Sequence, residues 1–198
     1  MFSLLSNVLA VDCTGIDDHT ALVAIYNAYN GPAWIGATNW NTAANVCTWA
    51  GVLCNGGGLV IELNVTGFGL TPVTATSSLD KLGCLVFLKS LTLNNNLING
   101  PFAAGLCQLN NLQYFNAINT GFNGALPACI CGMTNLMYLY LNNNLFSGPI
   151  PSCLGQMTFL HSMYLTCNNL DDPTTPINFA GAVYLTEFAV NCQINIAF

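Results

Sequence analysis

The stretch that sets the fold is Leu136-Met137-Tyr138-Leu139-Tyr140-Leu141-Asn142-Asn143-Asn144-Leu145-Phe146-Ser147-Gly148-Pro149-Ile150-Pro151, because its pattern recurs every 24 residues. Seven positions keep this spacing along the chain. The columns are Leu88, Leu112, Leu136 and Leu160; Leu91, Phe115, Leu139 and Met163; Leu93, Ala117, Leu141 and Leu165; Asn96, Thr120, Asn144 and Asn168; Ile98, Phe122, Phe146 and Leu170; Gly100, Gly124 and Gly148; and Phe102, Leu126 and Ile150. A repeat of this length predicts a solenoid.

Each unit is too small to bury its own apolar side chains, so successive coils must stack and bury them against their neighbours. Around Leu139 and Leu141 apolar residues alternate with other residues, which predicts a short parallel strand. Asn144 follows that strand, where its side-chain amide can satisfy the backbone groups of a buried corner.

These units resemble the plant-type leucine-rich repeat, and the residues before them resemble the N-terminal cap of that family. The cap-like features are Ala21-Leu22-Val23-Ala24-Ile25-Tyr26, Asn39-Trp40 and Cys47-Thr48-Trp49-Ala50-Gly51-Val52-Leu53-Cys54. The resemblance covers residues 17–198 and implies an α/β solenoid of about six repeats. This fold is a right-handed coil with short parallel β-strands on a concave face, a 3-10 or irregular convex side and a helical N-terminal cap.

Four segments are expected along the chain. Residues 1–16 form an apolar N-terminal segment that can serve as an intermolecular or anchoring arm, and residues 17–59 form the cap. Residues 60–184 carry the repeats, and residues 185–198 form a C-terminal repeat or cap. Within the cap, Asp17 or Asp18 is expected to start a helix that stops before Gly31 and Pro32.

Charged residues are scarce, and this excludes several classes of partner. The chain has 2 Lys+Arg against 8 Asp+Glu, a net charge of −6, and only 5% of its residues are charged. Ordinary soluble domains have about 25%. Lys81 and Lys89 cannot neutralise a phosphate backbone or hold an anionic membrane surface, so binding to nucleic acid is excluded. No apolar run approaches the ~18 residues of a transmembrane helix, so no membrane span is expected.

The ten cysteines favour disulfides and an extracellular or cell-surface location. Cys47 and Cys54 are expected to close a loop around Trp49. Neighbouring strands lie ~4.8 Å apart and a disulfide accepts Cα separations of ~4.4–6.8 Å, which favours bridges between equivalent positions of adjacent coils. The pairs are then Cys107–Cys131, Cys129–Cys153 and Cys167–Cys192; Cys13 and Cys84 bond either to each other or between molecules, and Cys84–Cys107 is an alternative.

No catalytic, metal or cofactor site is predicted. His19 lies at the expected helix start, and His161 has no acidic neighbour in sequence, so neither indicates a nucleophile–base pair. Asp12, Asp17 and Asp18 have no recognisable calcium-loop spacing. We expect a non-enzymatic protein without a cofactor.

The exposed strand positions predict a binding surface on the concave face. Its expected residues are Tyr114, Tyr138, Tyr140, Tyr164, Asn116 and Asn142. Tyrosine offers a large contact area and a hydroxyl group at low entropic cost, which suits interfaces and sugar stacking. The alternative is that these rings pack on one another and only cover the sheet.

Asn64-Val65-Thr66 is a glycosylation sequon, and an N-linked glycan is expected at Asn64. Because this position belongs to an exposed strand column, the glycan would occupy the N-terminal end of the concave face.

Two kinds of function compete. The low charge, the apolar first residues and the open solenoid ends favour an extracellular structural scaffold that self-associates into a filament or surface assembly. The alternative is a soluble recognition module that resembles receptor ectodomains or inhibitors and binds an extracellular protein or glycan. Ice binding is a minor alternative, which the irregular strand columns disfavour.

Overall fold

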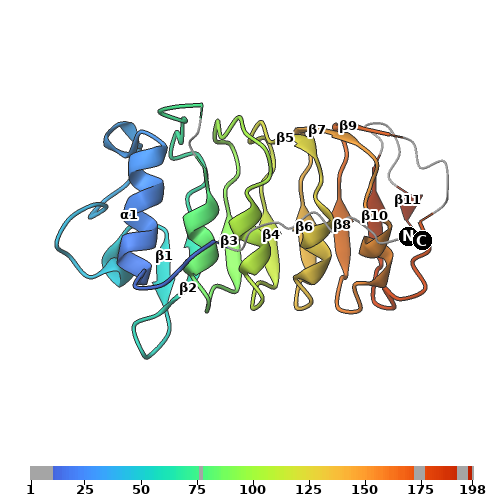
Figure 1. Cartoon of the computed structure of the whole chain (residues 1–198), viewed down its shortest axis with the longest axis horizontal. Coiled ribbons are helices and arrows are strands. Elements are labelled where there is room, and N and C mark those ends of the chain that lie inside the picture. Colours follow the sequence, from blue (N-terminus) through green and yellow to red (C-terminus); the bar gives the residue numbers. More distant parts are fainter. Residues whose placement is uncertain (1–10, 76–77, 172–176, 191–195, 198) are drawn as a thin grey trace.

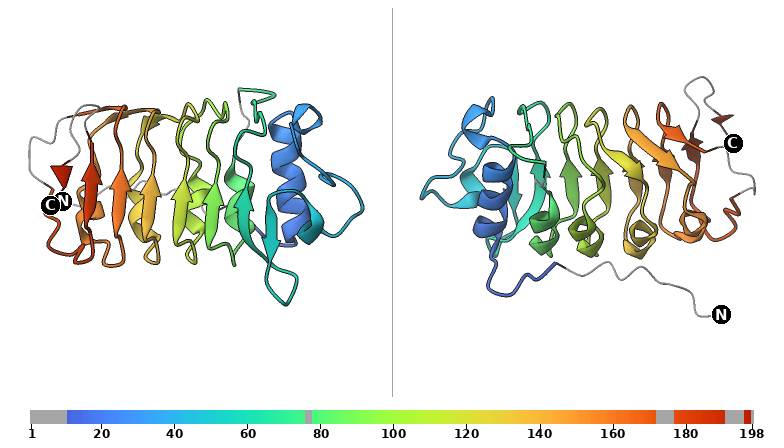
Figure 2. Two further views of the ribbon diagram at one scale, coloured as in Figure 1. Left: turned by 180° about the vertical axis from the view of Figure 1, so that it is seen from behind. Right: turned by 45° about the horizontal axis from the view of Figure 1, so that its top comes forward.

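The computed structural model describes residues 11–75, 78–171, 177–190 and 196–197. The chain winds into an elongated α/β solenoid in which coil follows coil from the N-terminal helix at one end to the last strands at the other (Figure 1). One long face is a sheet of short strands, and 3-10 helices lie on the opposite face (Figure 2). The α/β solenoid that the resemblance to leucine-rich repeats implied is therefore confirmed.

The main sheet has eight strands in the order β1-β2-β3-β4-β6-β8-β10-β11. From β2 to β10 neighbouring strands are parallel, and β1 and β11 pair antiparallel at the two ends. The strands are β1 (Val52–Cys54), β2 (Val60–Asn64), β3 (Ser90–Thr92), β4 (Tyr114–Asn116), β6 (Tyr138–Tyr140), β8 (Ser162–Tyr164), β10 (Glu187–Ala189) and β11 (Ile196–Ala197).

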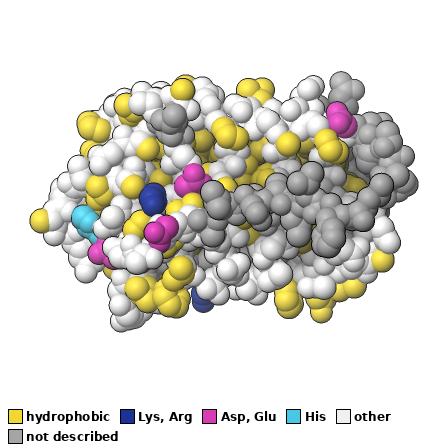
Figure 3. All heavy atoms as spheres, in the orientation of Figure 1, with side chains coloured by type: hydrophobic (Ala, Val, Ile, Leu, Met, Phe, Trp, Pro, Cys, Tyr) yellow, Lys and Arg dark blue, Asp and Glu magenta, His cyan; other side chains and the backbone are white. Residues whose placement is uncertain are grey.

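A second, smaller sheet runs along another side of the solenoid. Its strands are β5 (Asn123–Ala125), β7 (Leu145–Gly148) and β9 (Asn169–Leu170), all parallel. The convex side carries the 3-10 helices η3 (Asp80–Cys84), η4 (Ala104–Gln108), η5 (Ala128–Gly132) and η6 (Ser152–Gln156). Figure 3 shows this helical face, on which blue and magenta charged side chains are few.

The repeat columns are the core. Phe115, Leu139 and Met163, the inward-pointing central residues of β4, β6 and β8, are completely buried. Phe122 and Phe146 stack at 5.8 Å between ring centroids, one coil above the other. The core therefore runs continuously through the coils, as a solenoid requires because each coil contacts only its neighbours.

The cap closes the first coil with a helix and three tryptophans. The helix α1 (Asp18–Ala28) begins after Asp17, whose carboxylate accepts a hydrogen bond from the backbone N–H of Thr20. The short 3-10 helices η1 (Gly31–Ala33) and η2 (Val46–Thr48) follow. Trp34, Trp40 and Trp49 are buried, and the Trp40 ring lies 4.9 Å from that of Trp34 and 5.0 Å from that of Trp49.

The disulfides close both the cap and the convex side. Cys47 bonds Cys54, as expected. Cys13 bonds Cys84 within the chain, so the intermolecular bond and the alternative Cys84–Cys107 pairing are both wrong. Cys167 is also disulfide-bonded. The expected partner, Cys192, lies outside the described residues.

The expected pairing of the remaining four cysteines is wrong. Cys107 bonds Cys129 and Cys131 bonds Cys153, with Cα atoms 5.7 and 5.9 Å apart. Each bridge joins the fourth residue of one 3-10 helix to the second residue of the next. Neighbouring 3-10 helices therefore approach each other with an offset of two residues, so that the fourth position of one, and not its equivalent, lies beside the second position of the next.

Among the residues that the structure describes, no helix is long and apolar enough to cross a membrane.

Candidate functional site

The concave face is built from the outward-pointing residues of the parallel strands β2 to β10. Side chains alternate across a strand, so Leu139 points into the core while Tyr138 and Tyr140 point outward. The in-register pairing then places Tyr114 beside Tyr138, and Tyr140 beside Tyr164. The structure therefore brings together all four tyrosines predicted from the sequence.

The four rings form one cluster. Tyr114 contacts both Tyr138 and Tyr140, with ring centroids 6.0 and 5.7 Å apart. Tyr140 stacks on Tyr164 at 5.2 Å, with 21° between the ring planes. These separations suit favourable aromatic pairs, and all four side chains remain partly exposed. Ring packing and availability to a ligand are thus compatible here.

Sequence reasoning missed two members of this cluster. The His161 ring lies 5.9 Å from that of Tyr138 and stacks almost parallel on Tyr184 at 5.4 Å. Tyr184 is 53% exposed and extends the ring contacts beyond the strands, into the loop before β10. Its signal in the sequence is an aromatic residue two positions before the strand pattern Thr186-Glu187-Phe188. The aromatic cluster comprises Tyr114, Tyr138, Tyr140, His161, Tyr164 and Tyr184.

Two asparagines near Tyr140 in the sheet, Asn116 and Asn142, use their side-chain N–H groups in hydrogen bonds but leave their side-chain oxygens unpaired. Asn116 Nδ2 donates to the Tyr114 hydroxyl at 2.9 Å, and Asn142 Nδ2 donates to Thr166 Oγ1 at 3.0 Å. The Oδ1 atoms of both asparagines are buried and have no hydrogen-bond partner. An unmatched buried acceptor costs roughly 1–3 kcal/mol. The centre of the concave face therefore holds two hydrogen-bond acceptors without donors.

Glu187 lies at the C-terminal end of the concave face. Its carboxylate accepts hydrogen bonds from the Tyr164 hydroxyl at 2.6 Å and the Ser162 hydroxyl at 2.8 Å. These two bonds, from Tyr164 and then Ser162, lower the pKa of Glu187 and keep the carboxylate ionised. The bond to Glu187 raises the pKa of Tyr164. Among the described outward residues of β2 to β10, the charged ones are Glu62 and Glu187.

The sequon asparagine lies at the opposite end of this face. Asn64 is the last residue of β2 and is exposed, and its Oδ1 accepts a hydrogen bond from the backbone N–H of Thr66. Asn64 pairs in register with Thr92 of β3, and β3, β4 and β6 lie between its strand and that of Tyr164. Only β3 lies between the strand of Asn64 and that of Tyr114, and the other rings of the aromatic cluster lie farther from Asn64.

The other polar groups considered from the sequence have structural partners. Asp18 accepts a hydrogen bond from the backbone N–H of Val60, and Asp12 accepts one from that of Thr14. The His161 Nδ1 lies 2.7 Å from the Phe159 carbonyl oxygen. Within the described ranges, no three His, Cys, Asp or Glu side chains gather as a metal ion would require.

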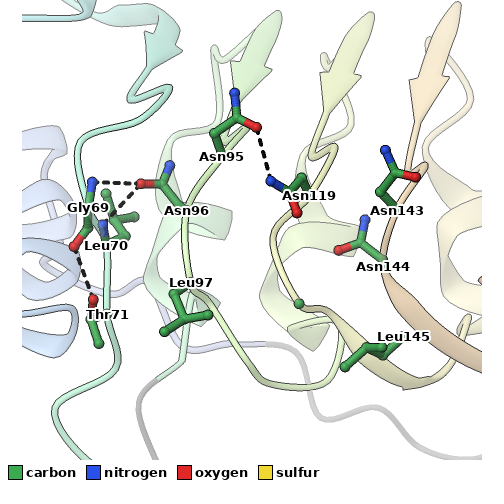
Figure 4. A pocket seen from close by; sticks show the side chains of 11 residues that line it. Gly69, Leu70, Thr71, Asn95, Asn96, Leu97, Asn119, Asn143, Asn144 and Leu145 are labelled. Carbon is green, nitrogen blue, oxygen red and sulfur yellow. Dashed lines mark hydrogen bonds between the residues drawn. The ribbon is translucent and has the colours of Figure 1, made fainter.

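A second surface follows the corner after the strands. Asn95, Asn119 and Asn143 occupy the same position in successive coils and share a left-handed backbone conformation, with φ of 56, 57 and 55°. Asn119 Nδ2 donates to Asn95 Oδ1 at 3.2 Å. They border a hollow of about 460 Å³ (Figure 4), whose lining residues carry no charge: Gly69, Leu70, Thr71, Asn95, Asn96, Leu97, Asn119, Gly121, Asn143, Asn144 and Leu145.

Comparison with known families decides what kind of solenoid this is. A model of the leucine-rich repeat N-terminal domain matches residues 16–55, and a leucine-rich repeat model matches residues 135–157. Receptor-like kinase TMK4 of Arabidopsis thaliana is 28% identical over 114 residues, which cover 56% of this chain and 11% of the kinase. The chain is an extracellular leucine-rich repeat protein of the plant type.

This leucine-rich repeat protein has a further relative in pollen receptor-like kinase 1 of Arabidopsis thaliana. The two are 38% identical over 64 residues, which cover 32% of this chain and 9% of the kinase. The chain thus spans about a tenth of the length of the curated relatives it matches. Its location is extracellular or at the cell surface.

Solved structures agree with this assignment. The Arabidopsis receptor kinase HAESA, in complex with the peptide hormone IDA and the co-receptor SERK1, is 26% identical with a TM-score of 0.73; the match covers 88% of this leucine-rich repeat protein and 30% of HAESA. The ectodomain of the Arabidopsis receptor kinase SOBIR1 has a TM-score of 0.71 at 21% identity and covers 93% and 95% of the two chains. A plant ice-binding protein has a TM-score of 0.66 at 24% identity, covering 78% and 49%. The last two matches show the fold.

Proposed function

We propose that this protein is a non-enzymatic recognition module that binds an extended segment of an extracellular peptide or protein across the concave face. The observation that carries the proposal is the aromatic cluster, in which partly exposed rings from β4, β6 and β8 adjoin one another. Clustered tyrosines of this kind dominate many binding surfaces. The likeness to HAESA, whose structure contains a peptide hormone and a co-receptor, supports this reading over a self-associating scaffold.

The ligand is expected to lie towards the C-terminal half of the face. The rings extend from β4 to the loop before β10, while the sequon lies on β2. A glycan on Asn64 would cover the N-terminal half and direct a ligand towards the cluster. Replacing Asn64 by Gln should therefore remove the glycan from the secreted protein without weakening binding.

Panning a random dodecapeptide library on the immobilised protein tests the proposal. Selected peptides should bind the Tyr138→Ala/Tyr140→Ala variant at least about tenfold more weakly, which corresponds to ~1.4 kcal/mol. The matched control is Ser90→Ala/Thr92→Ala on β3, which changes the same two columns outside the cluster. Failure to select any peptide, or equal binding to both variants, would refute a peptide-binding role for the cluster.

Ice binding is a second candidate, and one observation favours it. The corner asparagines Asn95, Asn119 and Asn143 repeat one side chain in one conformation on successive coils, next to an uncharged hollow. The outward strand positions of the concave face, by contrast, do not repeat one residue type from coil to coil. If this surface holds ice, Asn119→Asp should abolish inhibition of ice recrystallisation, and Tyr138→Ala/Tyr140→Ala should leave it intact. Absence of inhibition by the unaltered protein would exclude this candidate.

A further inference from the structure

Tyr164 differs from the other tyrosines of the aromatic cluster in the group that its hydroxyl meets. This hydroxyl donates to Glu187 Oε2 at 2.6 Å, which is a short, charge-assisted hydrogen bond. The Tyr114 hydroxyl instead lies 2.9 Å from Asn116 Nδ2, and an amide is a far weaker base than a carboxylate. Among the described residues, Tyr164 is therefore the cluster tyrosine whose hydroxyl proton has a carboxylate to accept it.

Glu187 is held in the form that can accept this proton. The hydrogen bonds from Tyr164 and Ser162 lower the pKa of Glu187, so the carboxylate is ionised near pH 7. The bond to Glu187 raises the pKa of Tyr164, so the phenol keeps its proton. Glu187 is exposed and Tyr164 is partly exposed, which leaves the pair open to a small molecule. The surface thus presents an intact phenol with a base in contact.

This arrangement favours one-electron oxidation of the phenol. A tyrosine ring that loses an electron becomes strongly acidic, because the positive charge on the ring weakens the bond between oxygen and hydrogen. A base that already accepts the hydroxyl hydrogen bond can take the proton as the electron leaves. The electron is then removed more easily than from a phenol without such a base. Tyr164 is therefore expected to be the most easily oxidised ring of the aromatic cluster.

The neighbouring rings direct oxidation towards Tyr164. Tyr140 stacks on Tyr164 with ring centroids 5.2 Å apart, and Tyr114 lies 5.7 Å from Tyr140. Electrons pass readily between aromatic rings in contact, so a radical formed on Tyr140 can take an electron from Tyr164. The radical then settles on the ring that is easiest to oxidise, even where the oxidant first reached another member of the cluster.

We propose that Tyr164 is a site of oxidative phenol coupling, with Glu187 as its proton acceptor. The oxidant is a peroxidase, which uses hydrogen peroxide to remove one electron from each of two phenols. Tyr164 loses an electron from its ring and its hydroxyl proton to Glu187, which releases the proton to water. This modification goes beyond the proposed recognition and does not depend on it.

The coupling step balances without a further reactant. The Tyr164 radical and a second phenoxyl radical form a carbon–carbon bond between ring positions next to their oxygens. The hydrogens displaced from these two carbons return to the oxygens, which restores both phenols. Overall, two phenols and one hydrogen peroxide give one coupled product and two waters. The result is a phenol-bearing molecule joined covalently to the concave face.

Peroxidase labelling with biotin-tyramide, a small phenol, tests the proposal. The folded protein is treated with peroxidase, hydrogen peroxide and the probe for a time short enough to leave most chains unlabelled. Pepsin digestion and mass spectrometry then locate the labelled tyrosines. Exposure alone would favour Tyr184, which is 53% exposed, over the less exposed Tyr164. We expect the opposite order, with at least about three times as much label on Tyr164 as on Tyr184.

Two matched variants isolate the carboxylate. Glu187→Gln keeps the shape of the side chain but removes the base, so the ratio of label on Tyr164 to label on Tyr184 should fall about fivefold. Glu62→Gln removes the other described charge among the outward strand positions, on β2, and should change this ratio less than about twofold. Because both tyrosines are measured in one digest, differences in peroxidase activity cancel.

Two results would overturn the proposal. The first is more label on Tyr184 than on Tyr164 in the unaltered protein, a comparison that needs no variant to fold. The second is an unchanged ratio in Glu187→Gln, once circular dichroism has shown that this variant is folded. Since the probe is a single phenol, neither result bears on peptide binding, which the library experiment measures separately.

Discussion

At the scale of single residues, the asparagine that follows the strand stabilises the turn of the chain by hydrogen bonds to backbone groups. Asn144 Nδ2 donates to the carbonyl oxygens of Ala117, Leu141 and Asn142, and its Oδ1 accepts from the backbone N–H groups of Thr120 and Phe122. One side chain thus satisfies backbone groups of two coils. Asn96 and Asn168 repeat these interactions in their own coils.

Replacing Asn144 by Ala should therefore destabilise the protein by about 2–4 kcal/mol, because it leaves several buried backbone groups without partners. Urea unfolding followed by circular dichroism measures the change as a lower midpoint. Ser147→Ala, at a partly exposed position three residues on, is the control and should cost less than about 0.5 kcal/mol. A cost for Asn144→Ala no larger than that of the control would mean that water replaces the side chain.

The hydrogen bonds of Glu187 predict a pH dependence with a definite sign. Tyr164 and Ser162 lower the pKa of Glu187 in the folded state. Their contribution is therefore present above the unfolded pKa and is lost as the pH falls through the lower folded pKa. Acidification below about 4.5, the ordinary value for this group, should weaken the contact with Tyr164.

The ring signals of Tyr164 in a nuclear magnetic resonance titration report this transition. They should shift with an acidic midpoint in the unaltered protein and lose that transition in Glu187→Gln. Tyr114, on the other side of Tyr140, serves as the internal control. A midpoint at or above that of an unperturbed glutamate would contradict the hydrogen-bonded arrangement.

At the scale of elements, the convex side is organised by the contact between the fourth residue of one 3-10 helix and the second residue of the next. Two of these contacts are disulfides. A third joins Gly83 to Gly105, where a Cβ on Gly83 would lie only 2.2 Å from the Gly105 carbonyl oxygen. The same contact between neighbouring 3-10 helices is therefore made by two glycines in one case and by a disulfide in two others. Both arrangements allow the helices to lie close together.

This contact explains why the repeat could be predicted from the sequence while two of the predicted disulfide pairs were wrong. The 24-residue period identifies equivalent positions, which determine the core, the strands and the outward columns. It does not tell which positions of neighbouring coils face each other. The glycines at 83 and 105, which are 22 residues apart like the bonded cysteines, are the signal that would have given the correct register.

Removal of one bridge with Cys131→Ser/Cys153→Ser should cost about 3 kcal/mol, the loop-closure value for a span of 22 residues. Because the loop belongs to the unfolded chain, the loss should appear mainly as a lower denaturation midpoint, with the ring contacts of the concave face preserved. Peptide mapping of the unreduced protein should recover the Cys107–Cys129 and Cys131–Cys153 pairs. Recovery of a Cys107–Cys131 fragment would contradict the structure.

At the scale of the whole molecule, the concave face combines predictable and unpredictable features. Tyr114, Tyr138, Tyr140 and Tyr164 were predicted to adjoin one another because a parallel register places equal columns side by side. The free acceptors of Asn116 and Asn142 could not be predicted, since they depend on which hydroxyl group each amide reaches. Tyr184 was missed because it lies in a loop, outside the strand columns.

The oligomeric state distinguishes a recognition module from a structural scaffold. A module that presents the concave face to a partner should remain monomeric, at the 21.1 kDa of the chain plus any glycan. The three hydrophobic side chains with the highest exposed fraction among the described residues support this expectation, since Ile35, Leu145 and Val183 belong to the cap, the corner and the last coil instead of one patch. Single exposed apolar residues of this kind are normal on monomeric proteins.

Light scattering coupled to size exclusion, over a concentration range of about a hundredfold, makes this measurement. We expect a constant mass at every concentration, and the same mass for Tyr138→Ala/Tyr140→Ala, because the tyrosines serve a partner instead of a second copy. A mass that rises with concentration, and that the tyrosine variant lowers, would show that the face binds its own chain. If the unaltered protein and the tyrosine variant formed fibres equally well, the assembly contacts would lie outside the concave face. That result would favour the structural scaffold over the recognition module.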